Sequence, residues 1–245
     1  MRQTALKSVF ELAKLDHRVV FIGSDLGAGT LKEMREELPN QFFMEGISEQ
    51  HLIGFASGLA KEGFIPYVNT IANFFTRRAF EQIAMDVVLH NLPVRLLASG
   101  GGMVYAPLGP THTAVDDLSL MSTIPKLRIF APGDANEMRE LIRLSHKSED
   151  PWYIRIGKGD EPLFSSDKQH QPNEPKFFGD TDAEILFLTT GVVIHEIIEA
   201  IKILNESGIL GIAAIHFSEL TCISFETWKD RYLLAQRVIV AEEHI

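Results

Sequence analysis

The chain has 245 residues, 45% of them hydrophobic and 23% charged, a composition typical of a globular protein with a substantial buried core. Its formal net charge of -10 argues against nucleic acid as a partner, because nucleic-acid sites usually present a basic surface. Cys222 is the single cysteine, so an internal disulfide is excluded and a reducing cytoplasm is the expected location. No stretch approaches the roughly 20 apolar residues of a membrane span, and no membrane partner is expected.

Helical and strand patterns alternate over residues 1–160. Apolar residues recurring every three or four positions predict helices, and short apolar, β-branched runs predict strands. This alternation predicts an α/β domain with a parallel sheet covered by helices on both faces. The expected helices are 4–15, 49–61, 75–89, 117–122 and 135–145, and the expected strands are 19–22, 65–68, 94–98, 127–131 and 152–156.

Residues 161–182 differ from the rest, because polar and loop-forming side chains such as Pro162, Pro172 and Pro175 dominate, and they predict a linker. A smaller α/β unit is expected over 183–245. Its three expected strands are 185–189, 211–216 and 238–241, and its expected helices are 193–207 and 225–234. Since this pattern stops abruptly, we expect an incomplete C-terminal domain.

An acidic residue marks the start of the helix expected over 49–61. Ser48 suits the N-cap, and Glu49 suits the first turn, where the positive end of the helix dipole favours an acid. Capping alone would explain both residues. Small residues such as Gly54 and Gly58 allow close packing on another backbone, either in the core or between chains.

Three other segments contain residues of interest. Asp25 follows the strand expected over 19–22, as turn-forming aspartates do. Phe74 and Phe75 lie at the start of an expected helix. An ordinary core helix, with its aromatic residues buried and salt bridges on its outer face, would explain this segment. His112 lies in a loop with the sequence Gly-Pro-Thr-His, where catalytic and purely structural roles are both open.

Taken together, these segments resemble the transketolase family, which includes 1-deoxyxylulose-5-phosphate synthase. The resemblance covers residues 1 to about 160 and continues more weakly to the VIVAEEH segment at 238–244, similar to a strand of the family's C-terminal domain. It implies the pyrimidine-binding type of thiamine diphosphate-binding fold. The motifs, in order, are GSDLGAG (23–29), GISEQHLIGFASGLA (46–60), NFFTRRAFEQI (73–83), GPTHTAVDDLSLMSTIPKLRIFAPGD (109–134) and PWYIRIGKG (151–159).

The resemblance also implies cofactor-binding residues. Glu49 matches the glutamate beside the pyrimidine nitrogen, which supports the proton transfer that activates thiamine diphosphate. Phe75 matches the aromatic that stacks on the pyrimidine. Asp25 matches an acidic residue near the thiazolium, and Arg78 an arginine important in the synthase branch.

Two further matches concern the substrate. His112 matches the histidine that faces the substrate, where it can hydrogen-bond sugar oxygens and move protons. Arg155 matches an arginine for the substrate phosphate, which suits a fork-shaped donor at the end of a parallel strand. A phosphorylated sugar is therefore the implied substrate.

The metal site of the family is missing from this sequence. In the family, a Gly-Asp-Gly segment and a later asparagine hold Mg²⁺ and the diphosphate, and Mg²⁺ requires such oxygen ligands. This chain has no Gly-Asp-Gly. Asp134 and Glu137 form a superficially similar segment that a helix capping box explains. We therefore expect no metal ligands here, and a diphosphate-binding N-terminal transketolase subunit as partner.

Two substitutions suggest altered substrate selection. Leu108 stands where the family usually has an aspartate, and Gly100 or Gly101 stands where the synthase has a phosphate-reading arginine. The expected function is therefore transketolase-like transfer of a two-carbon ketol unit, in a heterotetramer-like assembly that self-associates through the pyrimidine domain. The alternatives are a decarboxylating subunit, of the synthase or 2-oxo acid dehydrogenase beta type, and a non-catalytic assembly subunit.

Overall fold

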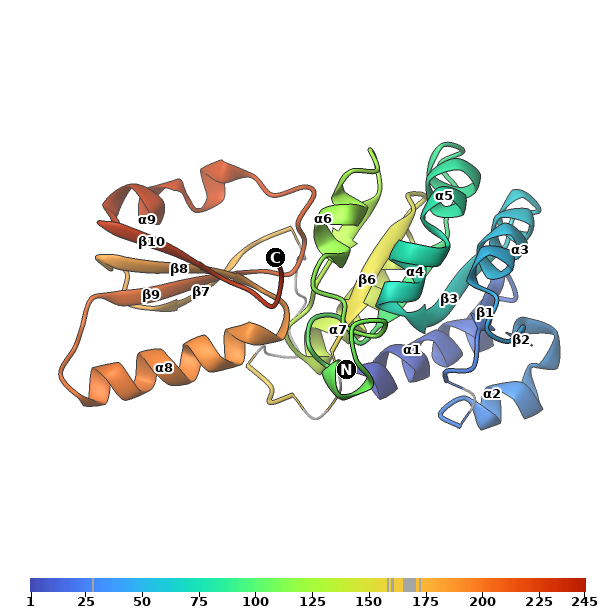
Figure 1. The fold of residues 1–245 in the computed structure, drawn as a ribbon, viewed down its shortest axis with the longest axis horizontal. Coiled ribbons are helices and arrows are strands. Elements are labelled where there is room, and N and C mark those ends of the chain that lie inside the picture. The colour runs from blue at the N-terminus through green and yellow to red at the C-terminus, as the bar shows by residue number, and fades with distance from the viewer. Residues whose placement is uncertain (28, 158, 160, 165–170, 172) are drawn as a thin grey trace.

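The computed structural model describes residues 1–27, 29–157, 159, 161–164, 171 and 173–245. They form two α/β units that lie side by side (Figure 1). The first contains six strands in the order β2-β1-β3-β4-β6-β5, all parallel, which confirms the predicted parallel sheet. These strands are β1 (Val19–Gly23), β2 (Phe42–Met44), β3 (Ile65–Ile71), β4 (Arg95–Ser99), β5 (Arg128–Phe130) and β6 (Trp152–Ile156).

Helices cover both faces of this sheet, as predicted. Alternate strand residues face opposite sides, so Phe21 packs in one apolar core and Ile22 in the other. The first core includes α1 (Arg2–Leu15), α2 (Lys32–Glu37) and α7 (Ala135–Ser145). The second includes α3 (Glu49–Lys61), α4 (Ala72–Arg78), η2 (Ile83–Val88) and α6 (Asp117–Ser122), with α5 (Phe80–Gln82) against it. Short 3₁₀ turns η1 (Pro39–Gln41) and η3 (Ala106–Leu108) lie in loops.

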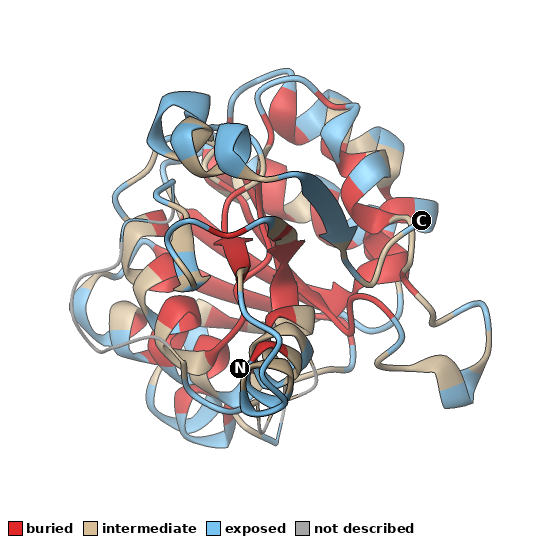
Figure 2. Ribbon diagram, turned by 90° about the vertical axis from the view of Figure 1, so that its left-hand side faces the viewer, coloured by how far each residue is buried: buried red, intermediate tan, exposed pale blue. Residues whose placement is uncertain are grey.

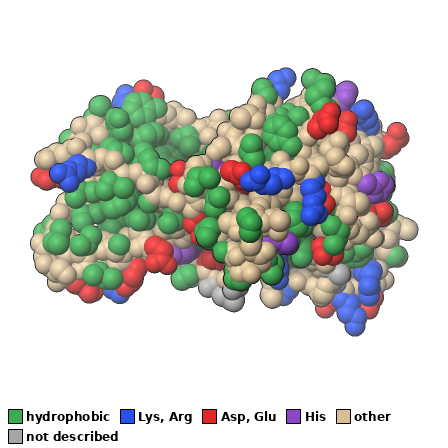
Figure 3. Space-filling model, viewed as in Figure 1, with side chains coloured by type: hydrophobic (Ala, Val, Ile, Leu, Met, Phe, Trp, Pro, Cys, Tyr) green, Lys and Arg blue, Asp and Glu red, His purple; other side chains and the backbone are tan. Residues whose placement is uncertain are grey.

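The second unit is a four-stranded mixed sheet in the order β10-β8-β9-β7. Helices α8 and α9 lie on its opposite faces (Figure 1). Figure 2 shows that the interior of the whole molecule is buried and that the outer faces of the helices are largely exposed. In Figure 3, hydrophobic side chains gather on the surface of the second unit. Its elements are β7 (Lys176–Gly179), β8 (Ile185–Thr190), η4 (Gly191–Val193), α8 (Ile194–Glu206), β9 (Ile212–Phe217), η5 (Phe225–Thr227), α9 (Lys229–Leu234) and β10 (Arg237–Ala241).

The predicted three-stranded second unit was wrong, because β7 adds a fourth strand. It falls inside the segment 161–182, which we predicted to be a linker, and pairs antiparallel with β9. A four-residue edge strand among prolines and polar residues has too short an apolar run to reveal itself by periodicity. Residues 165–170 and 172 of the predicted linker lie outside the described residues.

The helix predicted over 75–89 also differs. It is interrupted at Ala79 (φ -124°, ψ 15°) and continues as α5 and then as the π-helical η2, where the Leu89 amide donates to the Ala84 carbonyl. The apolar pattern continues across the interruption, so sequence periodicity does not detect it. Within the described part of the chain, no helix has both the length and the apolar character needed to cross a membrane.

Candidate functional site

The site begins at the centre of the first sheet, beyond the carboxyl ends of β1 and β3. The connection after β1 leads to α2 on one face, whereas that after β3 leads to α4 on the other. Ligands bind in open α/β sheets at such a topological switch point. Here Ser24 Oγ lies 3.1 Å from Thr70 Oγ1 and 3.0 Å from the Asp25 carboxylate. Asp25 is therefore at this edge, with its side chain exposed.

Glu49 reaches into the same crevice. It is the first residue of α3 and only 2% exposed. Its Oε1 accepts a hydrogen bond from Thr70 Oγ1 at 3.1 Å, and its Oε2 pairs with Arg78 Nη1 at 3.1 Å. Ser48 occupies the N-cap position, but its hydroxyl donates to the Glu45 carbonyl at 3.2 Å and makes no cap bond. Helix capping therefore does not explain why these groups gather around Glu49.

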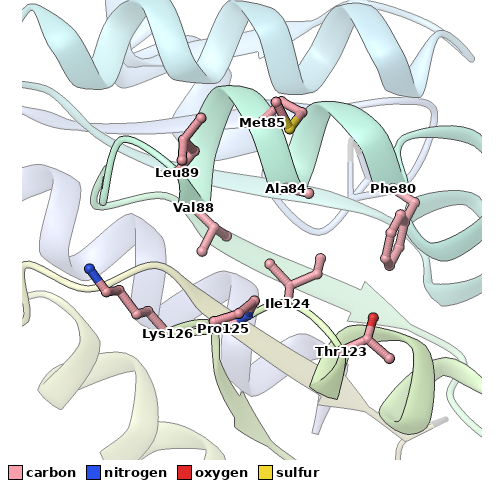
Figure 4. Close-up of a pocket in the computed structure, with 9 residues that line it drawn as sticks. All are labelled: Phe80, Ala84, Met85, Val88, Leu89, Thr123, Ile124, Pro125 and Lys126. Carbon is pink, nitrogen blue, oxygen red and sulfur yellow. The ribbon is translucent and has the colours of Figure 1, made fainter.

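A hollow of about 520 Å³ opens over this acid. It is lined by Ile47, Ser48, Glu49, Gln50, His51, Arg77 and Arg78. A second hollow, of about 410 Å³, lies between the α5–η2 segment and the turn after α6 (Figure 4). Its lining is mostly apolar, and Lys126 is the charged residue among the side chains that form it. The hollow at Glu49 is therefore the better candidate for chemistry.

Phe74 contacts both Arg78, the partner of Glu49, and His112. Its ring centroid lies 3.7 Å from the Arg78 guanidinium carbon and 5.2 Å from the His112 ring centroid. His112 is half-buried, with Nδ1 2.8 Å from Thr111 Oγ1. Glu49, Arg78, Phe74 and His112 thus form one continuous series of contacts.

Phe75, by contrast, is fully buried in the core between the sheet and α3. Its predicted stacking on the pyrimidine stays a prediction, and it requires an edge or face of this ring to become accessible. The sequence reasoning did not single out Phe74 as a site residue, nor did it name Thr70. The available signal for Thr70 was positional, because a polar residue near the carboxyl end of a buried parallel strand tends to face the ligand crevice.

Arg155 lies beneath the loop that carries His112 and is 6% exposed. Its Nη2 lies 3.1 Å from Asp117 Oδ1 and donates to the Ala114 carbonyl at 2.9 Å and the Glu243 carbonyl at 3.1 Å. Asp117 also accepts from the Tyr153 hydroxyl at 2.8 Å, and burial raises the pKa of this aspartate. Arg155 is therefore buried with its Nη2 engaged by protein groups, and its predicted role in binding a substrate phosphate stays a prediction.

We predicted that Gly100 or Gly101 stands where the synthase has an arginine, and close packing explains a glycine at position 101. A Cβ at Gly101 would lie 2.2 Å from Arg155 Nε, so a larger residue does not fit while this arginine holds its position. Leu108 is 60% exposed at the end of η3. Among the described residues, no three His, Cys, Asp or Glu side chains gather as a metal site. Asp134 is the N-cap of α7 and accepts from the Glu137 amide, which confirms the predicted capping role.

Comparison with known proteins agrees with this geometry. The sequence profile described as transketolase, pyrimidine binding domain, matches residues 1–162. The chain belongs to the transketolase family. This confirms the resemblance noted in the sequence and the α/β pyrimidine-domain fold, and it relates the chain to enzymes that use thiamine diphosphate.

Two curated relatives and one solved structure show which proteins this chain is similar to and how much of their length it covers. It is 28% identical to one subunit of the apulose-4-phosphate transketolase of Phocaeicola vulgatus, over 99% of this chain and 78% of that protein. It is 34% identical to 1-deoxy-D-xylulose-5-phosphate synthase 1 of Geobacter sulfurreducens, over 81% of this chain but only 31% of the synthase. A split gene transketolase, solved as an inactive beta4 tetramer, superposes with a TM-score of 0.87 at 29% identity, covering 99% of this chain and 79% of that one. The chain is therefore similar to the beta part of a split transketolase.

Proposed function

We propose that this chain supplies the pyrimidine half of a thiamine diphosphate site in a split transketolase. With a diphosphate-binding partner subunit, it would transfer a two-carbon ketol unit between phosphorylated sugars. The observation that carries the proposal is Glu49, a carboxylate that is 2% exposed, lies at the switch-point crevice and is held by Thr70 and Arg78. The similarity to a subunit of an apulose-4-phosphate transketolase supports the substrate class.

The described residues fit an aminopyrimidine at this position. Bound thiamine diphosphate would supply a carbon nucleophile and an electron sink. Glu49 would hold a proton at the pyrimidine nitrogen, and Arg78 and Thr70 would fix the direction of its carboxylate. His112, at the far end of the contact series, would hydrogen-bond sugar oxygens and transfer a proton.

The partner would complete the site. Because the sequence lacks Gly-Asp-Gly, we propose that the partner binds the diphosphate and Mg²⁺. The inactive beta4 tetramer of the similar split transketolase supports both self-association of this chain and its inactivity without a partner. We further propose a heterotetramer in the cytoplasm, with Arg155 reaching the substrate phosphate only after the Glu243 segment moves.

Reconstitution tests the proposal. The purified chain would be mixed with a subunit that contains the Gly-Asp-Gly domain, thiamine diphosphate and Mg²⁺, and ketol transfer from xylulose 5-phosphate or apulose 4-phosphate to aldose phosphates would be measured. The isolated chain should be inactive and the mixture active.

Glu49→Gln should lower kcat by about 10²-fold or more, as expected when a positioned proton-transfer group is lost. The matched control is Glu62→Gln, at the exposed C-terminal end of α3, and it should retain activity. Full activity of Glu49→Gln would refute the role of this acid.

Similarity to synthases favours a second candidate function. Several 1-deoxy-D-xylulose-5-phosphate synthases are 33–37% identical to this chain over 66–83% of its length, although the match covers only 25–33% of each synthase. A decarboxylating complex would release carbon dioxide from pyruvate in the presence of glyceraldehyde 3-phosphate. Release at a rate above that of ketol transfer would favour this candidate.

A further inference from the structure

Helix α4 carries side chains that contact both predicted catalytic groups. Arg78, at its C-terminal end, pairs with Glu49 at 3.1 Å. Phe74, one turn earlier, contacts both the Arg78 guanidinium and the His112 ring. The distance between the acid and the imidazole therefore depends on how firmly the His112 loop is attached to this helix.

Asn73 makes that attachment. It is fully buried on α4, and its Nδ2 donates to the Thr113 carbonyl at 2.8 Å and to the Pro110 carbonyl at 3.2 Å. These two carbonyls lie on either side of His112 in the chain. A single short side chain thus holds the loop at two points that bracket the imidazole.

The orientation of the Asn73 amide follows from its partners. A reversed amide would place Oδ1 against two carbonyl oxygens, which only accept hydrogen bonds, so Nδ2 must face the loop. In this orientation Oδ1 has no hydrogen-bond partner among the described residues. A buried acceptor without a partner costs folding free energy. An asparagine present despite that cost indicates that its two donors are the useful feature.

Other contacts of the loop do not replace this one. The Arg77–Asp116 ion pair also joins α4 to the loop, but its arginine side chain is 54% exposed, so solvent and salt weaken it. The backbone bridge between Gly102 and Ala114 fixes only one side of the loop. Asn73 is the buried side chain of α4 that reaches both sides.

We propose that Asn73 is a positioning residue that holds His112 at a fixed distance from Glu49 and Arg78. The proposal deepens the proposed function, on which the role of His112 rests. Asn73 would touch neither cofactor nor substrate and would act through the loop backbone. Its loss should therefore affect turnover more than binding.

Hydrogen exchange in the isolated chain tests the clamp without any assay of activity. Asn73→Ala should raise amide exchange over residues 109–116 about tenfold or more, with the secondary-structure signal in circular dichroism unchanged. Asn73→Asp should behave similarly at neutral pH, because a carboxylate of the same shape cannot donate. The matched control is Asn69→Ala, because Asn69 is equally buried. Its Nδ2 donates to the Leu97 carbonyl at 2.7 Å and to Ser99 Oγ at 3.0 Å. Both of these partners lie in β4 and not in the loop. Wild-type protection of the loop in Asn73→Ala would overturn the proposal.

Activity of the reconstituted complex provides the second readout. Asn73→Ala should lower kcat by about 10–100-fold with little change in KM for the sugar phosphate, because a misplaced catalytic group slows the reaction without removing a binding contact. Faster loop exchange combined with a wild-type kcat would overturn the positioning role. If the wild-type complex shows no ketol transfer, the proposed function fails, while the exchange experiment still decides whether Asn73 holds the loop.

Discussion

Glu49 and Arg78 form an ion pair in which one side chain is buried and the other is not. This difference in burial determines how much the pair contributes to stability. The Glu49 side chain is 2% exposed, whereas that of Arg78 is 46% exposed. The arginine therefore neutralises a buried charge while part of its own hydration remains. Removing it would leave a carboxylate in the crevice with Thr70 as its hydrogen-bond donor.

A double-mutant cycle measures this coupling. Arg78→Ala and Glu49→Gln, singly and together, should show a coupling energy of about 1–3 kcal/mol in urea unfolding at neutral pH. The control is the Lys14–Glu37 pair, whose nitrogen and oxygen lie 2.9 Å apart with both side chains about half exposed. Its coupling should not exceed about 1 kcal/mol. Equal coupling in the two cycles would show that burial of Glu49 contributes nothing.

Individual site residues were predictable to different degrees. Glu49, Arg78 and His112 were identified through the resemblance, and the structure brings them into one series of contacts. The resemblance also singled out Phe75 and not Phe74. Sequence alone could not give the directions of these two side chains, because neighbours on a helix point about 100° apart and the rotation of the helix is not known. The structure places Phe75 in the core and Phe74 between the two catalytic candidates.

At the scale of elements, α7 and α3 begin in contrasting ways. The N-cap of α7 is Asp134, which is fully buried; its Oδ1 accepts from the Glu137 amide at 2.9 Å and its Oδ2 from the Phe164 amide at 3.0 Å. Ser48, at the N-cap of α3, makes no side-chain cap bond. One helix start thus depends on its cap and the other does not.

Alanine substitution should separate the two helix starts. Asp134→Ala should lower the free energy of unfolding by about 2 kcal/mol or more, because a cap bond is lost and the half-buried Phe164 amide also loses its partner. Ser48→Ala should change it by no more than about 0.5 kcal/mol. Both values can be obtained from urea titrations followed by circular dichroism. Similar losses in the two variants would contradict this interpretation.

The elements that sequence patterns missed are short or irregular. The β2 strand has three residues, α2 has six, and β7 has four, so none is long enough for an apolar pattern to repeat several times. The strands at the centre of the first sheet, such as β3 and β4, were predicted because they contain short, mostly apolar runs, and the structure buries them on both faces.

At the scale of the whole molecule, two buried glutamates make contacts that join the two units. Glu219, fully buried, accepts two-pronged hydrogen bonds from Arg128, and Glu137 on α7 contacts His216 on β9 and Lys176 on β7. These contacts join residues far apart in the sequence, so local patterns carried no signal for them. The two units therefore behave as one packed body rather than as domains on a free linker.

The segment at Glu243 links this packing to pH. Burial raises the pKa of the Glu243 carboxyl, and Arg155 offsets only part of that effect. Because the pKa is higher in the folded state than in the unfolded chain, folding favours the protonated form. The stabilising contribution is complete below the unfolded value of about 4.3 and is lost as the pH rises through the folded value.

Glu243→Gln should remove this pH dependence. We expect the variant to match the wild type at about pH 4 and to be more stable by about 1 kcal/mol or less at pH 7, since the half-buried carboxyl is partly screened by solvent. Free energies of unfolding in urea between pH 4 and 8 would measure the difference. The control is the exposed neighbour, as Glu242→Gln, which should parallel the wild type throughout. A Glu243→Gln variant that is less stable than the wild type at pH 7 would mean that attraction to Arg155 outweighs burial, and that the anion fastens this segment over the arginine.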